Sequence, residues 1–237
     1  MAVVHFDNIG TPPVLKKLIV LALALFALPV CGQPLDDTEL RLIDWIDAHN
    51  DEAIGLLEET VNISSGTMNH DGVRAVGRVM QRELDSVGLD TEWIDMPPEV
   101  NRAGHLFGRK ESGSGKKFVL IGHLDTVFEA DDAFQAYSRK GDVATGPGVD
   151  DMKAGNVIIA YALKALDANG LLDDIPVVVA YLGDEEKSGR PLSISREHLV
   201  EAGRWADIAL GFESAVHRDG HDWSTVARRS ATRWLLT

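Results

Sequence analysis

One histidine and four acidic residues of this chain are of the types that bind divalent metal ions. Four of the five positions follow apolar segments, and one lies at the start of a predicted helix; the residues are His123, Asp151, Glu185, Glu186 and Glu213. An imidazole combined with several carboxylates and no thiolate suits zinc, manganese or cobalt and disfavours a structural zinc finger. Adjacent carboxylates at the end of a buried segment are also costly unless a positive charge balances them.

The apolar segments predict the strands that position these side chains. Residues 118–121, 176–182 and 207–212 are almost entirely apolar, which is typical of strands covered on both faces of a sheet. A candidate ligand follows each segment within three residues. Because ligand sites in open α/β sheets form at the carboxyl ends of the strands, these side chains are expected to meet at one rim.

Other strand and helix signals alternate with these three strands. Further strands are predicted at 91–94 and 103–108, with another beginning in 224–236; helices at 36–62, 73–87, 151–166 and 193–206; and a turn-rich connection at 141–148. This alternation favours an α/β fold with helices on both faces of the sheet.

Each candidate residue also has an ordinary structural explanation. Residues 123–125 can form a turn with a local hydrogen bond, and Asp150 or Asp151 can cap the helix that follows. The acidic run 184–187 can be a solvated loop, and Glu213 alone carries no information. These explanations weaken when the candidate residues occur after predicted apolar strands of one chain.

Two relations between neighbouring residues indicate how such a site would work. Asp125 is two residues from His123 and can accept the second imidazole N–H, which fixes the orientation of the ring. Of two adjacent glutamates, one can bind metal while the other stays free for proton transfer. Since a carboxylate can also bridge two ions, the pattern indicates a two-metal hydrolase.

Composition excludes some partners and the N-terminus predicts export. The chain has 237 residues, 45% of them hydrophobic, and a formal net charge of −14, which disfavours nucleic acid and anionic membranes as partners.

Lys16 and Lys17 precede an apolar stretch at 18–30, as in a secretory signal peptide. We expect a signal peptide at 1–32, cleavage near Gly32 and a periplasmic or secreted protein that is free of the membrane after cleavage. Lipoprotein processing at Cys31, the single cysteine, is the less favoured alternative.

Three motifs contain most of the candidate residues: Gly-His-Leu-Asp-Thr-Val-Phe at 122–128, Gly-Pro-Gly-Val-Asp-Asp-Met-Lys-Ala-Gly at 146–155 and Asp-Glu-Glu-Lys-Ser-Gly at 184–189. Together they resemble the M20 family of zinc peptidases, near glutamate carboxypeptidase. Gly-Phe-Glu-Ser at 211–214 and Ser-Gly-Thr at 65–67 fit the family more weakly. The resemblance covers roughly residues 38 to 237.

The resemblance implies a metal ligand set. His123 and Glu213 would bind one zinc, Glu186 would bind a second, and Asp151 would bridge both, with cobalt or manganese as possible substitutes. It also implies a cis peptide bond that is not followed by proline, between Asp151 and Met152.

The resemblance further implies a reaction and a fold. Glu185 would be the general base and Asp125 the residue that orients the imidazole, in hydrolysis of a peptide or N-acyl amino-acid amide bond. The implied fold is an α/β three-layer sandwich with a mostly parallel mixed sheet, in which the catalytic domain occupies 33–222 and a connection to a dimerisation domain starts at 223–237.

This sequence departs from the family pattern in its C-terminal part. The dimerisation domain and the last metal-binding histidine of the family are not in the sequence, and His217 and His221 are poor substitutes for that histidine. The expected chain is therefore an incomplete catalytic domain whose oligomeric state is open. A metal-binding remnant without catalysis, and an aminopeptidase or deacylase of the same fold, are the alternatives.

Overall fold

The computed structural model of this protein describes residues 34–223. The predicted signal peptide at 1–32 and the strand predicted to begin in 224–236 lie outside the described residues. The candidate site lies in a compact unit that starts at Glu39, called the second unit below.

The centre of the second unit is a mixed five-stranded sheet in the order β1-β2-β6-β3-β7. Its strands are β1 (Asp90–Ile94), β2 (His105–Lys110), β3 (Phe118–His123), β6 (Val177–Leu182) and β7 (Ile208–Gly211). Strands β6, β3 and β7 pair in parallel, whereas β2 is antiparallel to both of its neighbours. Four strands therefore run in one direction, and the expected mostly parallel mixed sheet is confirmed.

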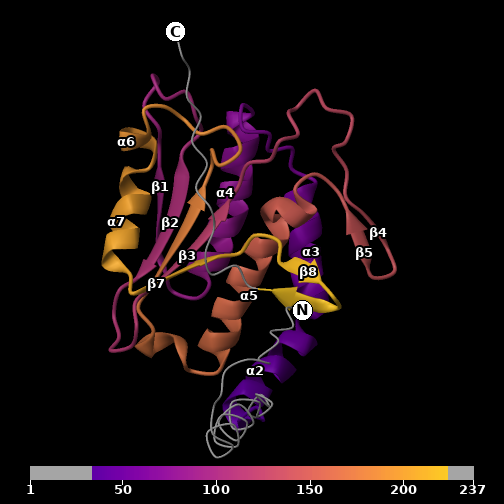
Figure 1. Ribbon diagram of the computed structural model, residues 1–237, viewed down its shortest axis with the longest axis vertical. Helices are drawn as coiled ribbons and strands as arrows, with labels where there is room; N and C mark the ends of the chain where they lie inside the picture. Colours follow the sequence, from indigo (N-terminus) through magenta and orange to yellow (C-terminus); the bar gives the residue numbers. More distant parts are fainter. Residues whose placement is uncertain (1–33, 224–237) are drawn as a thin grey trace, which may run out of the picture. The chain divides into compact units, whose positions relative to one another are not determined.

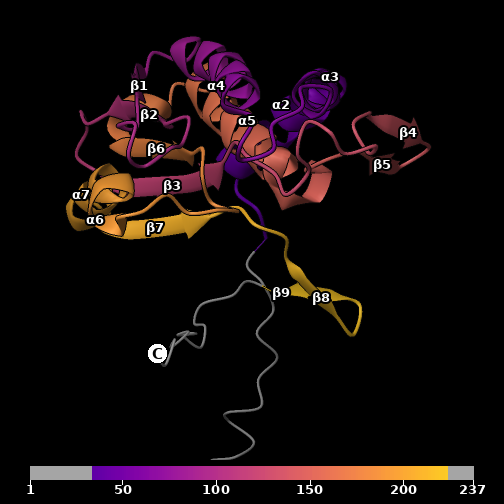
Figure 2. The ribbon, with the colours of Figure 1, turned by 90° about the horizontal axis from the view of Figure 1, so that it is seen from above.

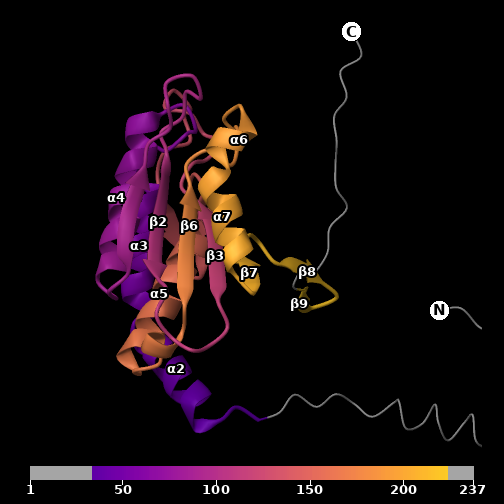
Figure 3. The same cartoon turned by 90° about the vertical axis from the view of Figure 1, so that its left-hand side faces the viewer.

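Helices cover both faces of this sheet, as Figures 1 and 2 show. Helices α4 and α5 pack against one face and α7 against the other, and α3 packs on α5 (Figure 3). The helices are α2 (Asp37–Ala48), α3 (Asn50–Val61), α4 (His70–Asp85), α5 (Ala154–Ala168), α6 (Leu192–Ser195) and α7 (Glu197–Trp205), with short turns η1 (Val149–Lys153) and η2 (Leu172–Asp174). The predicted three-layer α/β arrangement is confirmed. Within residues 34–223, no helix is long and apolar enough to cross a membrane.

The continuous apolar run of strand β6 matches its central place in the sheet, where both of its faces are covered. Alternate side chains of a strand point to opposite faces. Val177, Val179 and Tyr181 belong to the core on the α4–α5 side, and Val178 and Ala180 to the core on the α7 side. Both faces of the strand are therefore buried, which explains why its side chains are almost all apolar.

The register of the parallel strands places their carboxyl ends at one edge of the sheet. His123 at the end of β3 lies opposite Leu182 at the end of β6, and Ile121 lies opposite Gly211 at the end of β7. Figure 1 shows these three strands side by side. Side chains that follow the three strands therefore start from the same rim.

Several element boundaries differ from the sequence prediction. The predicted helix at 36–62 is divided at His49, and the one at 193–206 is divided at Arg196. The turn-rich connection at 141–148 contains the second strand of a hairpin, β4 (Ser138–Lys140) with β5 (Val143–Thr145). A second hairpin, β8 (Val216–Arg218) with β9 (His221–Trp223), was also not predicted. These strands are three residues long and largely exposed, so they carry no apolar alternation.

Candidate metal centre

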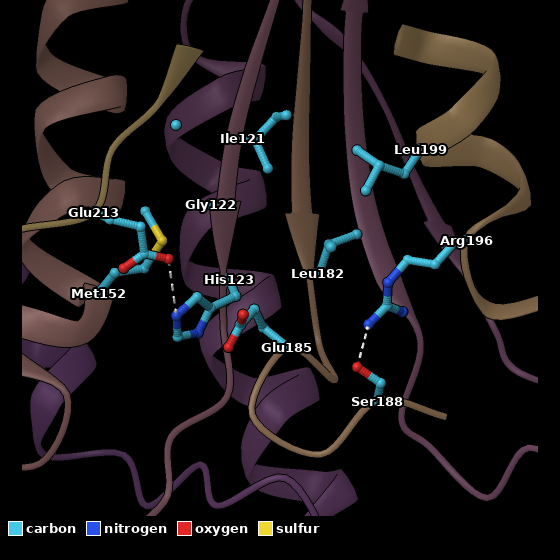
Figure 4. A pocket seen from close by; sticks show the side chains of 11 residues that line it. Ile121, Gly122, His123, Met152, Leu182, Glu185, Ser188, Arg196, Leu199 and Glu213 are labelled. Atoms are coloured by element: carbon cyan, nitrogen blue, oxygen red, sulfur yellow. Dashed lines mark hydrogen bonds and ion pairs between the residues drawn. The ribbon is translucent and has the colours of Figure 1, made fainter. Parts of the chain in front are cut away.

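The five candidate ligands meet at the carboxyl ends of β3, β6 and β7. Ligand atoms of His123, Asp151 and Glu213 all lie within 4.8 Å of one another, and so do those of His123, Glu185 and Glu186. Figure 4 shows the carboxylates of Glu185 and Glu213 on either side of the His123 ring. The structure therefore brings together every residue for which the sequence predicted a metal-binding or base role.

The hydrogen bonds of His123 leave one ring nitrogen facing carboxylates. Nδ1 donates to the main-chain oxygen of Asp125 at 2.9 Å. Nε2 lies 2.9 Å from Oδ1 of Asp151 and 3.6 Å from Oε1 of Glu213. A neutral imidazole that donates through Nδ1 presents a lone pair at Nε2, so three lone-pair donors face one another. This arrangement needs a proton or a metal cation between them.

The pKa values reflect the same crowding of negative charge. Burial tends to lower the pKa of His123, but the carboxylates of Asp125 and Glu213 outweigh burial and raise this pKa to about 9. Burial, followed by the carboxylate of Asp151, raises the pKa of Glu186 to about 7. A divalent cation would relieve both effects, because its charge favours the deprotonated form of each ligand.

Asp151 lies in a turn and does not cap a helix. Its backbone is non-helical, with φ −116° and ψ 94°, and the peptide bond between Asp151 and Met152 is cis, as the resemblance implied. Helix α5 begins at Ala154, where no side chain caps the helix. The alternative in which Asp151 is a helix cap is therefore wrong, and the predicted helix starts three residues later than expected.

A close approach between α5 and the segment after β7 positions Glu213. The amide of Phe212 donates to the main-chain oxygen of Ile121 at 3.3 Å, which continues the pairing beyond β7. A Cβ at Gly155 would lie 2.1 Å from the main-chain oxygen of Phe212. A glycine is therefore required at 155 for Glu213 to reach the rim.

A buried ion pair supports the loop that carries the two glutamates. The Asp184 carboxylate is fully buried and accepts hydrogen bonds from the amide of Gly189 at 2.7 Å and from Nη1 of Arg196 at 2.6 Å. Nη2 of Arg196 donates to the hydroxyl of Ser188 at 3.1 Å, as Figure 4 shows. Arg196, which lies between α6 and α7, thus ties both ends of the loop. The sequence placed Asp184 in a motif but gave no signal of this partner.

A cavity of about 350 Å³ opens beside the candidate ligands. His123, Glu185 and Glu213 line it together with apolar residues of the sheet and of α7, including Ile121 and Leu199. The cavity gives a small molecule access to the carboxylate of Glu185, whose residue is exposed.

The donor set fits divalent zinc, manganese or cobalt. It contains one imidazole and several carboxylates, without a thiolate, and the atoms are close enough to share an ion. His217 and His221 lie on the β8–β9 hairpin and belong to neither group of potential ligands found within residues 34–223.

Lys153, two residues after Asp151, is buried with an exposed fraction of 1%. Its Nζ donates to the main-chain oxygens of Thr60 at 2.9 Å and Ile63 at 3.0 Å, so it ties the turn of Asp151 to the end of α3. Burial lowers the pKa of Lys153 to about 7. Sequence patterns give no sign of such a residue, because a lysine normally predicts an exposed position.

We expect Lys153 to make stability depend on pH. Between its native pKa of about 7 and its unfolded value of about 10.4, the unfolded chain binds a proton that the native chain does not. The free energy of unfolding of the metal-free protein should therefore rise with pH across this interval, by at most about 1.4 kcal/mol per unit from this group. Urea unfolding at pH 7, 8 and 9 should show that the wild type gains stability relative to Lys153→Met. A stability difference between the wild type and Lys153→Met that does not change with pH would contradict this prediction. Lys140→Met is the control, because Lys140 is exposed.

Comparison with known proteins finds similarity to peptidases. Residues 119–226 match the model of "Peptidase family M20/M25/M40". Carboxypeptidase G2 of Pseudomonas sp. (strain RS-16) is 34% identical over 161 residues, which cover 68% of this chain and 38% of that protein.

Solved structures share the fold at lower sequence identity. Human carnosine dipeptidase 1 is similar with a TM-score of 0.62 and 21% identity, covering 74% of this chain and 41% of that one. The M20 family metallo-carboxypeptidase Sso-CP2 from Sulfolobus solfataricus has a TM-score of 0.55 and 17% identity, and the match covers 70% of this chain and 38% of that one. The chain thus spans about 40% of the length of these relatives.

Proposed function

Because this chain belongs to the M20/M25/M40 peptidase family, we propose that it takes part in metal-dependent hydrolysis of an amide bond in a small peptide or an N-acyl amino acid. The observation that carries the proposal is the approach of His123 Nε2 to Oδ1 of Asp151, at 2.9 Å, and to Oε1 of Glu213, at 3.6 Å. The similarity to a carboxypeptidase favours cleavage next to a free carboxylate, and the side chain of the substrate is left open.

We assign the ligands to two ions. His123, Asp151 and Glu213 would hold the first ion, and Asp151 and Glu186 would contribute to the second. Bound divalent cations supply a polarised carbonyl and a water of lowered pKa, near 7. The first assignment rests on the group of His123, Asp151 and Glu213, whose ligand atoms lie within 4.8 Å of one another. The second follows the family resemblance and is supported by the interaction between the carboxylate charges of Asp151 and Glu186.

The remaining carboxylate, Glu185, would move the proton. It is exposed and lines the cavity, so its oxygens can reach a water molecule there. Glu185 accepts a proton from that water as the water attacks the scissile carbonyl, and returns the proton to the leaving amine. Asp125 keeps the His123 ring oriented through its main-chain oxygen.

The test is a hydrolysis assay combined with metal counting. Purified protein loaded with zinc should release amino acid from a panel of dipeptides and N-acyl amino acids, and a chelator should abolish this turnover until zinc is returned. Two ions with chelator-sensitive turnover support the hydrolase. A protein that binds an ion and hydrolyses no member of the panel would instead be a metal-binding protein without catalysis.

A further inference from the structure

The fully buried carboxylate of Asp125 holds the backbone of the glutamate pair. Oδ1 accepts the amide of Glu185 at 3.0 Å, and Oδ2 accepts the amide of Glu186 at 3.1 Å. Its nearest approach to the His123 ring is longer, 3.5 Å from Oδ1 to Nδ1. The main role of this carboxylate is therefore to fix the turn of the two glutamates, while the main-chain oxygen of Asp125 fixes the imidazole.

A third donor to this carboxylate comes from a distant segment of the chain. The hydroxyl of Thr67, also fully buried, donates to Oδ2 of Asp125 at 2.6 Å. Hydrogen bonds to a carboxylate are among the stronger ones in proteins. With both amides and this hydroxyl in place, each carboxylate oxygen has a partner, and the plane of the carboxylate is determined.

The backbone around Thr67 leaves its hydroxyl little freedom. The amide of Thr67 donates to the main-chain oxygen of Thr126 at 3.2 Å, and the amide of Thr126 donates back to Ser65 at 2.9 Å. A Cβ at Gly66 would lie 2.5 Å from the Cα of Glu129, so only glycine allows the two segments to lie this close. The hydroxyl is thus fixed relative to the end of β3.

We infer that Thr67 is a positioning residue for the glutamate pair, which acts by fixing the carboxylate of Asp125 that holds the amides of Glu185 and Glu186. Without the hydroxyl, a buried carboxylate oxygen loses its closest donor, and this loss favours rotation of the carboxylate towards Nδ1 of His123. Such a rotation would release the amides of the pair. An effect of Thr67 on turnover rests on the proposed function, whereas its effect on the hydrogen bonds of the Glu185 and Glu186 amides does not.

The experiment compares Thr67→Val, which keeps the shape but removes the hydroxyl, with Thr67→Ser, which restores the donor. The control is Thr60→Val, because Thr60 is equally buried and its hydroxyl bonds only within α3, to the main-chain oxygens of Leu56 and Leu57. NMR hydrogen exchange on the metal-free proteins follows the amides of Glu185 and Glu186. Steady-state kinetics on the zinc-loaded proteins follow kcat and KM.

In Thr67→Val, the two amides should exchange at least tenfold faster than in the wild type, while amides of β6 keep their rates. In the same variant kcat should fall about 10–100-fold with little change in KM. This is the range of loss found when a residue that orients a metal ligand is removed. Thr67→Ser should restore both properties, and Thr60→Val should change neither.

Unchanged exchange of both amides in a folded Thr67→Val protein would overturn the inference, and so would a Thr67→Ser protein as impaired as the valine variant. If Thr67→Val does not fold, Thr67→Cys takes its place, because a thiol has similar size and is a weak donor. If the zinc-loaded wild type has no turnover, the proposed function fails, and the exchange rates still decide the role of Thr67.

Discussion

Replacing Glu185 by glutamine is expected to lower kcat about 10²–10⁴-fold in the zinc-loaded protein, while the number of bound ions stays the same. Glutamine has the shape of glutamate but cannot accept the proton of the attacking water. The side chain is exposed and lines the cavity, so its replacement leaves the packed core intact. Glu185→Ala should behave in the same way. The measurements are steady-state hydrolysis and metal counting on the same preparation.

Glu58→Gln is the matched control for this experiment, because Glu58 is an exposed residue of α3 outside the candidate site. Full activity in Glu185→Gln would remove Glu185 as the base. Loss of an ion along with activity would make Glu185 a ligand, which the group of His123, Glu185 and Glu186 allows geometrically.

Replacing Asp151 by asparagine is expected to weaken zinc binding more than any other single substitution at the site. Asp151 is the carboxylate nearest to Nε2 of His123, at 2.9 Å, and we assign it to both ions. The loss of zinc affinity should exceed about 100-fold, the upper end of the range for residues that only support a ligand. Competition with a chromophoric chelator measures this affinity, and turnover should fall in parallel.

Asp150→Asn provides the control, since Asp150 is the exposed neighbour of Asp151 and carries the same charge. The Asp150 variant should bind zinc as the wild type does. Equal losses in the two variants would mean that zinc responds to the general negative charge of the turn, and Asp151 would lose its assignment as a bridging ligand.

The sequence predicted the part of the site that depends on the central strands. Apolar runs mark strands β3, β6 and β7 within two residues of their observed limits. Strands β3 and β6 are largely buried as expected, whereas β7 is exposed at the edge of the sheet, so the expectation that it is covered on both faces is wrong. Because side chains after parallel strands share one edge, the meeting of His123, Glu185 and Glu213 followed from chain order alone. The motifs at 122–128, 146–155 and 184–189 then identified the family, which comparison confirmed.

The sequence could not show contacts between segments far apart in the chain. The carboxylate of Asp125 points to amides of residues 185 and 186 and to the hydroxyl of Thr67, which come from two other segments. Proximity along the chain had instead suggested the imidazole of His123 as its main donor. The buried position of Lys153 also depends on the carbonyl groups of Thr60 and Ile63, some 90 residues earlier.

Anomalous X-ray diffraction at the zinc absorption edge, on crystals of the zinc-loaded protein, tests the central claim most directly. We expect a strong peak about 2.0–2.2 Å from Nε2 of His123 and from carboxylate oxygens of Asp151 and Glu213. A second, weaker peak is expected beside Glu186. Zinc bound only elsewhere, for example at His217 or His221, with no peak at Nε2 of His123, would contradict the account.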